Sequence, residues 1–301
     1  RVSGPIWYDN TAPAPFVRYG TDTGQVANSY AVAVDLADGC VYVTSFGAID
    51  VNLLTIERNR VIKFDADGNF LFEFGSPGSG NGQFGPAVPT TSSPGPSGIA
   101  VSPVDGSVYV YDGYNNRVQK FNSSGTYQTK WGSAGTGNGQ FGSSLTNTIA
   151  VDASGNVYVT DKGNYRVQKF TSTGTFSAKV VTNASGDGFL SSPYDVKIGM
   201  SGNVYVSRVA HTASAPTLPD IQVYNAALSS LVATIPYDTT TEPGVFGPRG
   251  YAFISPNADG TLWVAPLYTN FIKKIDASGA ELSRYYLPET ISTYANDNYS
   301  I

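Results

Sequence analysis

The sequence contains little of the chemistry that metal centres and covalent catalysis require. Its 301 residues include one cysteine, Cys40, and one histidine, His211. A zinc site with several histidine or cysteine ligands therefore cannot be assembled from this chain, and Cys40 has no partner for an internal disulfide. A catalytic thiol needs a neighbouring base, so we expect Cys40 to be a small core residue on a strand. We predict no metal ion and no cofactor.

Charge is scarce as well. Only 14% of the residues are charged, and 18 Lys and Arg stand against 23 Asp and Glu, for a net charge of −5. Nucleic-acid-binding proteins normally present a basic stripe, so we predict no nucleic-acid partner. No apolar run approaches the roughly 18 residues of a membrane helix, so we predict no transmembrane segment. The chain opens with Arg1 rather than methionine, which suggests that the numbering begins after a processed or omitted segment.

A repeat of about fifty residues runs through the chain. The motif Arg-Val-x-Lys-Phe occurs at residues 60–64, 117–121 and 166–170, and degraded copies follow. Each copy is preceded by an Ala-Val or Ile-Ala-Val segment and then by Gly-x-Val-Tyr-Val, and it is followed by a glycine turn and an aromatic segment. β-Branched and aromatic residues favour strands, and Gly, Asn and Asp between them favour turns. One unit therefore holds four short strands, here called a, b, c and d.

The chain ends complete this arrangement. Residues 1–20 resemble strands c and d, and residues 288–301 weakly resemble a and b. A row of blades leaves unpaired edges, and closing the row removes them. We therefore predict an all-β single domain over 1–301, a six-bladed β-propeller of four-stranded antiparallel blades whose sixth blade is shared by the termini. Alternatively the chain is part of a longer protein and the two halves pair elsewhere. The complete units span residues 26–75, 82–132, 139–181, 188–235 and 244–287.

Two segments resemble NHL repeats. They are Arg117–Phe121 and Arg166–Phe170, each preceded by an aspartate, and the Gly-Asn-Gly-Gln-Phe linkers ending at Phe84 and Phe141 fit the same pattern. The resemblance is strongest over about residues 26–180 and implies a six-bladed propeller. It implies little about activity, because propellers of this type include protein-binding, RNA-binding, sensor and lyase members. The lyase members rely on several histidines, which this chain does not supply.

Three motifs of the repeat have a structural interpretation beside a functional one. The pairs Asp112/Arg117 and Asp161/Arg166 could grip a ligand, but a motif that recurs in successive blades favours a brace for the b–c loop. The glycine-rich linkers lack the following helix of a phosphate-binding loop, so we expect turns. Residues 65–69 resemble the start of a calcium loop but lack its distal glutamate, which favours a hairpin.

Loop lengths suggest where binding would occur. The longest connections are b–c or d–a, at 45–59, 75–96, 207–220 and 236–247, and in a four-stranded meander these emerge at the same edge of every blade. Loops on a rigid scaffold often carry function, although they can also merely decorate a face. We expect no catalytic residue, and His211 is interpreted as a loop residue. The binding-face candidates are Asp50, Glu57, Arg58, Tyr114, Tyr165, Arg208, His211, Asp220, Glu242 and Arg249.

The predicted function follows from these exclusions. We predict a non-enzymatic, extracellular or cell-surface propeller that binds a protein partner or copies of itself, in a surface layer or filament. Asn122, Asn183 and Asn298 begin Asn-x-Ser sequons and are candidate glycosylation sites. Two alternatives remain open: a ligand-sensing domain of a larger surface protein, and a hydrolase or lyase with an acidic site at the channel mouth.

Overall fold

A computed structural model describes nine stretches of the chain, and these consist almost entirely of strands. The only other element in them is a 3-10 helix, η1 (Lys162–Asn164). The chain divides into two compact units, unit 1 (Arg1–Trp131) and unit 2 (Gly132–Ile301). No helix in these stretches is long and apolar enough to span a membrane. The described residues are 18–19, 23–26, 29–46, 59–86, 95–182, 191–210, 220–236, 251–266 and 271–286.

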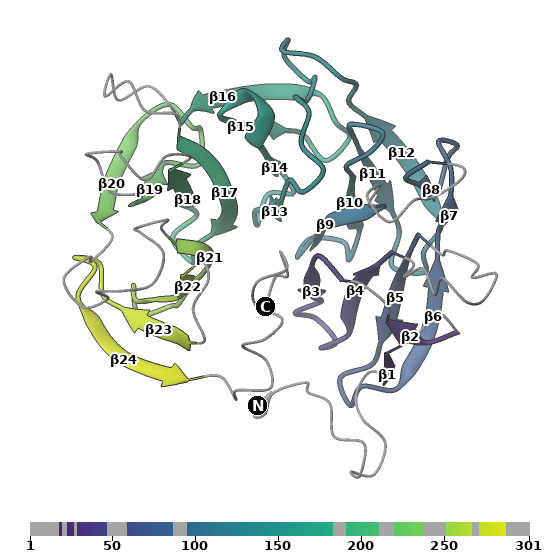
Figure 1. The fold of residues 1–301 in the computed structure, drawn as a ribbon, viewed down its shortest axis with the longest axis horizontal. Helices are drawn as coiled ribbons and strands as arrows, with labels where there is room; N and C mark the ends of the chain where they lie inside the picture. The colour runs from purple at the N-terminus through teal and green to yellow at the C-terminus, as the bar shows by residue number, and fades with distance from the viewer. Residues whose placement is uncertain are drawn as a thin grey trace. The chain divides into compact units, whose positions relative to one another are not determined.

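Unit 1 contains two four-stranded antiparallel blades (Figure 1). In each blade the strands pair in chain order, so that every strand is hydrogen-bonded to the one before it. The first blade consists of β3 (Val32–Val34), β4 (Val41–Ser45), β5 (Arg60–Phe64) and β6 (Phe70–Phe74). The second consists of β9 (Pro96–Val101), β10 (Val108–Asp112), β11 (Arg117–Phe121) and β12 (Tyr127–Trp131).

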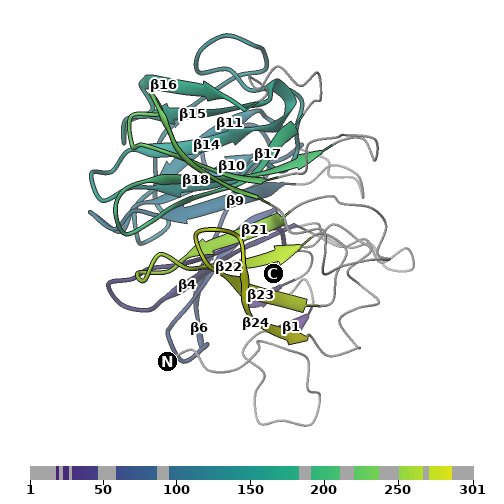
Figure 2. The same ribbon diagram turned by 90° about the vertical axis from the view of Figure 1, so that its left-hand side faces the viewer.

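Unit 2 contains three blades of the same construction, and Figure 2 shows strands of its first two blades running side by side. The first consists of β13 (Ile149–Val151), β14 (Val157–Asp161), β15 (Arg166–Phe170) and β16 (Phe176–Val181). The second consists of β17 (Ser191–Ile198), β18 (Val204–Ala210), β19 (Asp220–Tyr224) and β20 (Leu231–Pro236). The third consists of β21 (Tyr251–Pro256), β22 (Leu262–Pro266), β23 (Phe271–Ile275) and β24 (Glu281–Tyr286).

The described residues therefore form five four-stranded antiparallel blades, two in unit 1 and three in unit 2, where six were predicted. The terminal segments 1–17 and 287–301, on which a sixth blade depends, lie outside the described residues. The one strand described near the N-terminus, β1 (Arg18–Tyr19), pairs in parallel with β2 (Gln25–Val26). In the same way β7 (Ser76–Pro77) pairs in parallel with β8 (Gln83–Phe84). Both linkers end in a Gly-Gln-apolar sequence. In each case this sequence pairs with the short strand that precedes the linker.

Burial explains why the repeat has this sequence pattern. All five residues of β4, β10 and β14 are buried, because both faces of these middle strands are covered by protein. The last strands, such as β12 and β16, alternate between half-buried and exposed residues. Strand d is therefore the solvent-facing margin of each blade.

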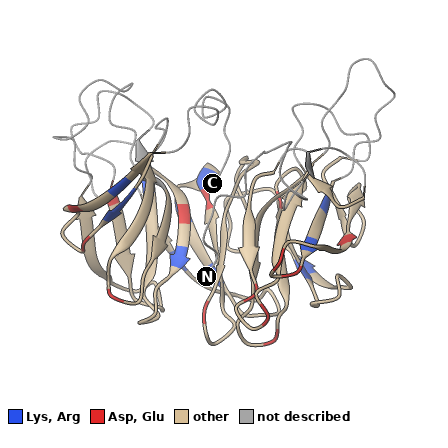
Figure 3. Cartoon of the chain, turned by 90° about the horizontal axis from the view of Figure 1, so that it is seen from below, with Lys and Arg blue, Asp and Glu red and all other residues tan. Residues whose placement is uncertain are grey.

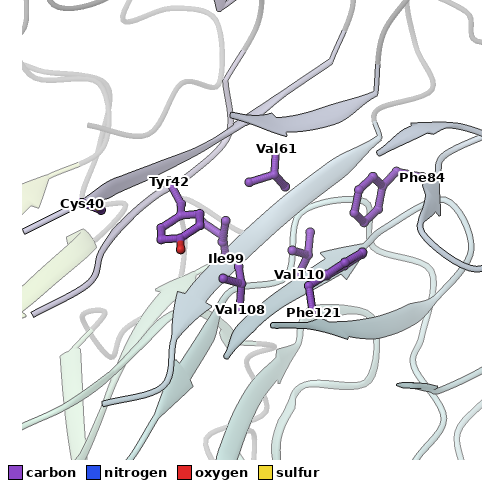
Figure 4. Close-up of a cluster of buried hydrophobic side chains, with 8 residues drawn as sticks. All are labelled: Cys40, Tyr42, Val61, Phe84, Ile99, Val108, Val110 and Phe121. Carbon is purple, nitrogen blue, oxygen red and sulfur yellow. The ribbon is translucent and has the colours of Figure 1, made fainter. Parts of the chain in front are cut away.

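The core of unit 1 lies between its two blades (Figure 4). It contains residues from both blades and from the linker between them: Cys40, Tyr42, Val61, Phe84, Ile99, Val108, Val110 and Phe121. Cys40 is buried, as predicted, but it precedes β4 by one residue and is not on the strand itself. Burial raises the pKa of the Cys40 thiol, which favours the unreactive protonated form.

Candidate functional site

Asp112 and Arg117 form a buried brace in unit 1. The Asp112 carboxylate is fully buried and accepts hydrogen bonds from Arg117 Nε at 2.9 Å, Asn115 Nδ2 at 2.8 Å and the Gly85 amide at 2.9 Å. The Arg117 guanidinium donates to the carbonyl oxygens of Ser79, Gly80 and Gln83 at 2.6 to 2.9 Å. The brace therefore holds the linker that enters the blade, in addition to the b–c turn for which it was predicted.

Unit 2 repeats this brace. Asp161 accepts from Arg166 Nε at 2.7 Å, Asn164 Nδ2 at 2.9 Å and the Gly142 amide at 2.9 Å. Arg166 in turn donates to three carbonyl oxygens of the preceding glycine-rich linker. Carbonyl oxygens that point at a guanidinium do not bind phosphate, which confirms the turn interpretation of these linkers. Asp65 likewise caps its own hairpin, accepting from the Asp67 and Asn69 amides.

The next blade contains the same brace with its charges exchanged. Arg208 lies on strand b and Asp220 on strand c, and both Arg208 Nε and Nη2 donate to the Asp220 carboxylate at 2.6 Å. Arg208 Nη1 also donates to the Thr182 carbonyl at 2.8 Å, in the preceding linker. Both residues were predicted to lie on the binding face. The structure places both of them, buried, in a contact within the blade.

A second polar cluster in unit 2 lies at the start of strands a. Lys162, in η1, places its Nζ 3.3 Å from Thr146 Oγ1 and 3.9 Å from the centre of the Tyr194 ring. The neighbouring Asp195 is fully buried and accepts from Lys197 Nζ at 3.0 Å and from the Ile254 amide at 3.2 Å. Lys162 is half-buried as a residue, but its ammonium end is enclosed by protein.

Asn147 completes this cluster. It is 1% exposed, and its Oδ1 accepts from the Lys162 amide at 3.1 Å. Its Nδ2 is buried and has no hydrogen-bond partner. Leaving a buried donor unsatisfied costs about 1–3 kcal/mol, so the amide is a candidate contact for a ligand. In the described part of the chain no group of three His, Cys, Asp or Glu is placed to hold a metal ion.

Comparison with known proteins agrees with the repeat and the fold. The NHL repeat family matches residues 94–121 and 147–170, which include both Asp–Arg braces. The chain is an NHL-repeat β-propeller. No curated protein matches the sequence.

Several solved structures share the fold of this NHL propeller at low sequence identity. A streptogramin B lyase is 17% identical with a TM-score of 0.54, and the match covers 87% of this chain and 69% of that one. A chain of a nidogen–laminin complex is 14% identical with a TM-score of 0.57, covering 87% and 81%. A hydrazine synthase chain of Kuenenia stuttgartiensis is 14% identical with a TM-score of 0.57, covering 84% and 66%. At these identities the likeness shows the fold alone.

Two of the other predicted binding-face residues of the NHL propeller lie in turns. Tyr114 lies in the β10–β11 turn and is 46% exposed. Tyr165 lies in the equivalent turn of unit 2, with a left-handed backbone at φ 53°, and its carbonyl accepts from the Thr182 amide and hydroxyl. Six candidates lie outside the described residues and stay predictions: Asp50, Glu57, Arg58, His211, Glu242 and Arg249.

The enclosed ammonium makes the stability of the NHL propeller depend on pH. Burial lowers the pKa of Lys162 from 10.5 to about 8, although the nearby Asp195 charge acts in the opposite direction. Between these two pKa values the unfolded chain binds more protons than the folded one, so stability from this group rises with pH. Below about pH 8 the ammonium is charged in both states and its burial lowers stability.

We therefore expect Lys162→Met to raise the free energy of unfolding more at pH 7 than at pH 10.5, by up to about 3 kcal/mol. Each unit of pKa shift is worth about 1.4 kcal/mol, and solvent around the exposed part of the Lys162 side chain reduces the effect. Urea unfolding of both proteins across this range measures it. A stability difference that does not change with pH would contradict this expectation.

Proposed function

We propose that this NHL propeller is a non-enzymatic, extracellular protein-binding module that associates with copies of itself through the outer strands β20 and β24. The observation that carries the proposal is a concentration of exposed apolar residues. Of the fifteen large hydrophobic residues that are exposed in the described chain, five lie on these two strands of unit 2: Leu231, Val232, Leu282, Tyr285 and Tyr286. Exposed apolar residues on the outer strands of two successive blades are candidates for an interaction surface.

The charge pattern distinguishes β20 from the other last strands. The last strands of the other four blades each carry at least one charged residue, whereas β20, with the sequence Leu-Val-Ala-Thr-Ile-Pro, carries none. Charged residues on an edge strand prevent pairing with other chains. Four consecutive residues of β20, Leu231 to Thr234, are exposed. Without charge on β20, a second copy can approach this strand with no like-charge repulsion from it.

The contact with a second copy would be symmetric, because most oligomers of one chain use the same patch on both subunits. Tyr285 and Tyr286 suit such a contact, since tyrosine is enriched among the residues that dominate binding energy. Figure 1 draws β20 and β24 along one outer margin of unit 2. The scarcity of charge over the described strands is visible in Figure 3, and the acidic, charge-poor composition supports the extracellular part of the proposal.

A charge on this surface should abolish the association. We expect wild-type protein at high concentration to scatter light as a species larger than one chain, and Val232→Lys to return it to the mass of one chain, because two symmetric lysines would then repel each other. Val104→Lys is the matched control, since Val104 is 60% exposed in a turn of unit 1. Substitutions at such exposed sites change stability by about 0.5 kcal/mol or less.

Two outcomes would overturn the self-association. One is a wild-type protein that stays monomeric at every concentration, and the other is equal dissociation of both variants.

The extracellular location has its own test, antibody labelling of intact source cells, and a signal that requires permeabilisation would contradict it. Glycosylation at Asn122 belongs to the same proposal: this residue lies in the β11–β12 turn, with its Oδ1 accepting from the Ser124 and Thr126 amides. Asn183 and Asn298 lie outside the described residues.

A further inference from the structure

We propose that Asn147 and Lys162 form a binding site in unit 2 for the carboxylate group of a ligand. The two residues are joined through the main chain, because Asn147 Oδ1 accepts from the Lys162 amide at 3.1 Å. The site uses none of the residues of the proposed β20–β24 surface, and it is therefore independent of self-association.

The unpartnered amide of Asn147 is the observation that points to a ligand. An asparagine side chain offers two N–H donors at Nδ2 and one acceptor oxygen. The oxygen is used, whereas Nδ2 is buried with no partner. Polar groups buried to this extent are almost always hydrogen-bonded. A ligand atom that accepts a hydrogen bond from Nδ2 would remove the cost of leaving it unsatisfied.

The charges around the site favour an anion. Lys162, Lys197 and Asp195 are the charged residues of the cluster, and together they carry one positive charge in a chain whose net charge is −5. Lys197 is paired with Asp195 at 3.0 Å. Lys162 makes no such ion pair, and its Nζ instead contacts the Thr146 hydroxyl and the Tyr194 ring. Its charge is offset in part by the nearby Asp195, and a bound anion would neutralise it further.

The number of free cations favours a carboxylate over a phosphate. The Asn147 amide and the single Lys162 ammonium can donate to the two oxygens of a carboxylate, and hydrogen bonds between charged partners are the stronger ones. A phosphate dianion would need a second cation, and Lys197 is already engaged by Asp195. Tyr194 and Phe253 pack edge to face, with ring centres 5.5 Å apart, and both are half-buried. They offer an apolar wall for the carbon atoms that bear the carboxylate.

The test uses acetate as the probe and the full chain. We expect acetate to shift the NMR signals of the Asn147 side-chain amide and the Lys162 ε-carbon along one saturable curve, while methylammonium shifts neither. Asn147→Asp replaces the donor with an oxygen of the same size and should weaken acetate binding at least about tenfold, which corresponds to about 1.4 kcal/mol. Lys162→Met should weaken it likewise.

Lys169→Met is the matched control. Lys169 also places its Nζ over a tyrosine ring, that of Tyr158 at 5.3 Å, but its Nζ donates to the Ala226 carbonyl at 2.8 Å. We expect this variant to bind acetate like the wild type. A blocked glutamate peptide as a second probe separates the sources of the carboxylate. Tighter binding of the peptide than of acetate indicates an acidic side chain of a partner protein, and weaker binding indicates a free acid.

Three results would overturn the proposal. The first is an absence of any shift with acetate or the peptide, which would mean that water alone satisfies Asn147. The second is equal binding by the wild type, Asn147→Asp and Lys162→Met. The third is a stronger response to inorganic phosphate than to acetate. Asn147→Asp and Lys162→Met change different segments. If one variant fails to fold, acetate binding by the other still tests the proposal.

Discussion

Replacing Asp112 with alanine is expected to lower the free energy of unfolding by about 3–5 kcal/mol, because it leaves a buried charge without its partner. The substitution removes the acceptor of three hydrogen bonds at once, those from Arg117, Asn115 and Gly85. Burial raises the pKa of the Asp112 carboxyl even though these three donors act to lower it. The intact pair therefore adds little net stability, and the large cost arises from breaking it.

The control is Asp105→Ala in the same blade. Asp105 forms an ion pair with Lys120 at 3.5 Å, but its side chain is 49% exposed, and exposed pairs contribute about 0–1 kcal/mol. Urea unfolding of the wild type and both variants measures the difference. If Asp112→Ala destabilises the protein no more than Asp105→Ala, the brace does not hold the linker in place.

The features that recur in successive blades could be predicted from the sequence. The Arg-Val-x-Lys-Phe motif located strand c of three blades, and the Gly-x-Val-Tyr-Val motif located strand b, because both carry apolar residues that suit a buried strand and turn residues flank these strands at fixed positions. The bracing role of Asp112 and Arg117 was also predictable, since acid and base are separated only by the short b–c turn. The NHL resemblance rested on these same residues.

Contacts between distant segments could not be predicted in this way. Arg117 donates to carbonyl oxygens 34 to 38 residues earlier, and main-chain acceptors have no signature in the sequence. Arg208 and Asp220 form a brace across a long connection, so they resembled free loop charges. Lys162, Asn147 and Tyr194 come from three separate segments. A useful signal exists only for Asn147, a polar residue two positions before the apolar strand a, β13.

Truncating Phe121 to alanine is the second change with a large expected effect, about 3–5 kcal/mol for an aromatic residue in a packed core. Phe121 is 1% exposed, and its ring centre lies 4.7 Å from that of Phe74 in the other blade of unit 1 and 5.7 Å from that of Phe84 in the linker. The cavity would open between the two blades, where neither sheet can collapse without moving against the other.

The matched control is Phe70→Ala, since Phe70 is 39% exposed at the margin of the first blade and packs edge to face with the Phe64 ring at 6.5 Å. A loss of about 1 kcal/mol is expected there, in proportion to the apolar area it buries. Phe170 occupies the place of Phe121 in unit 2, fully buried and 6.0 Å from Phe141. If packing of strand c against the linker stabilises each blade, Phe170→Ala must be as costly as Phe121→Ala in denaturant unfolding. Equal, small losses for all three variants would show that the blades are held by their hydrogen bonds and not by these rings.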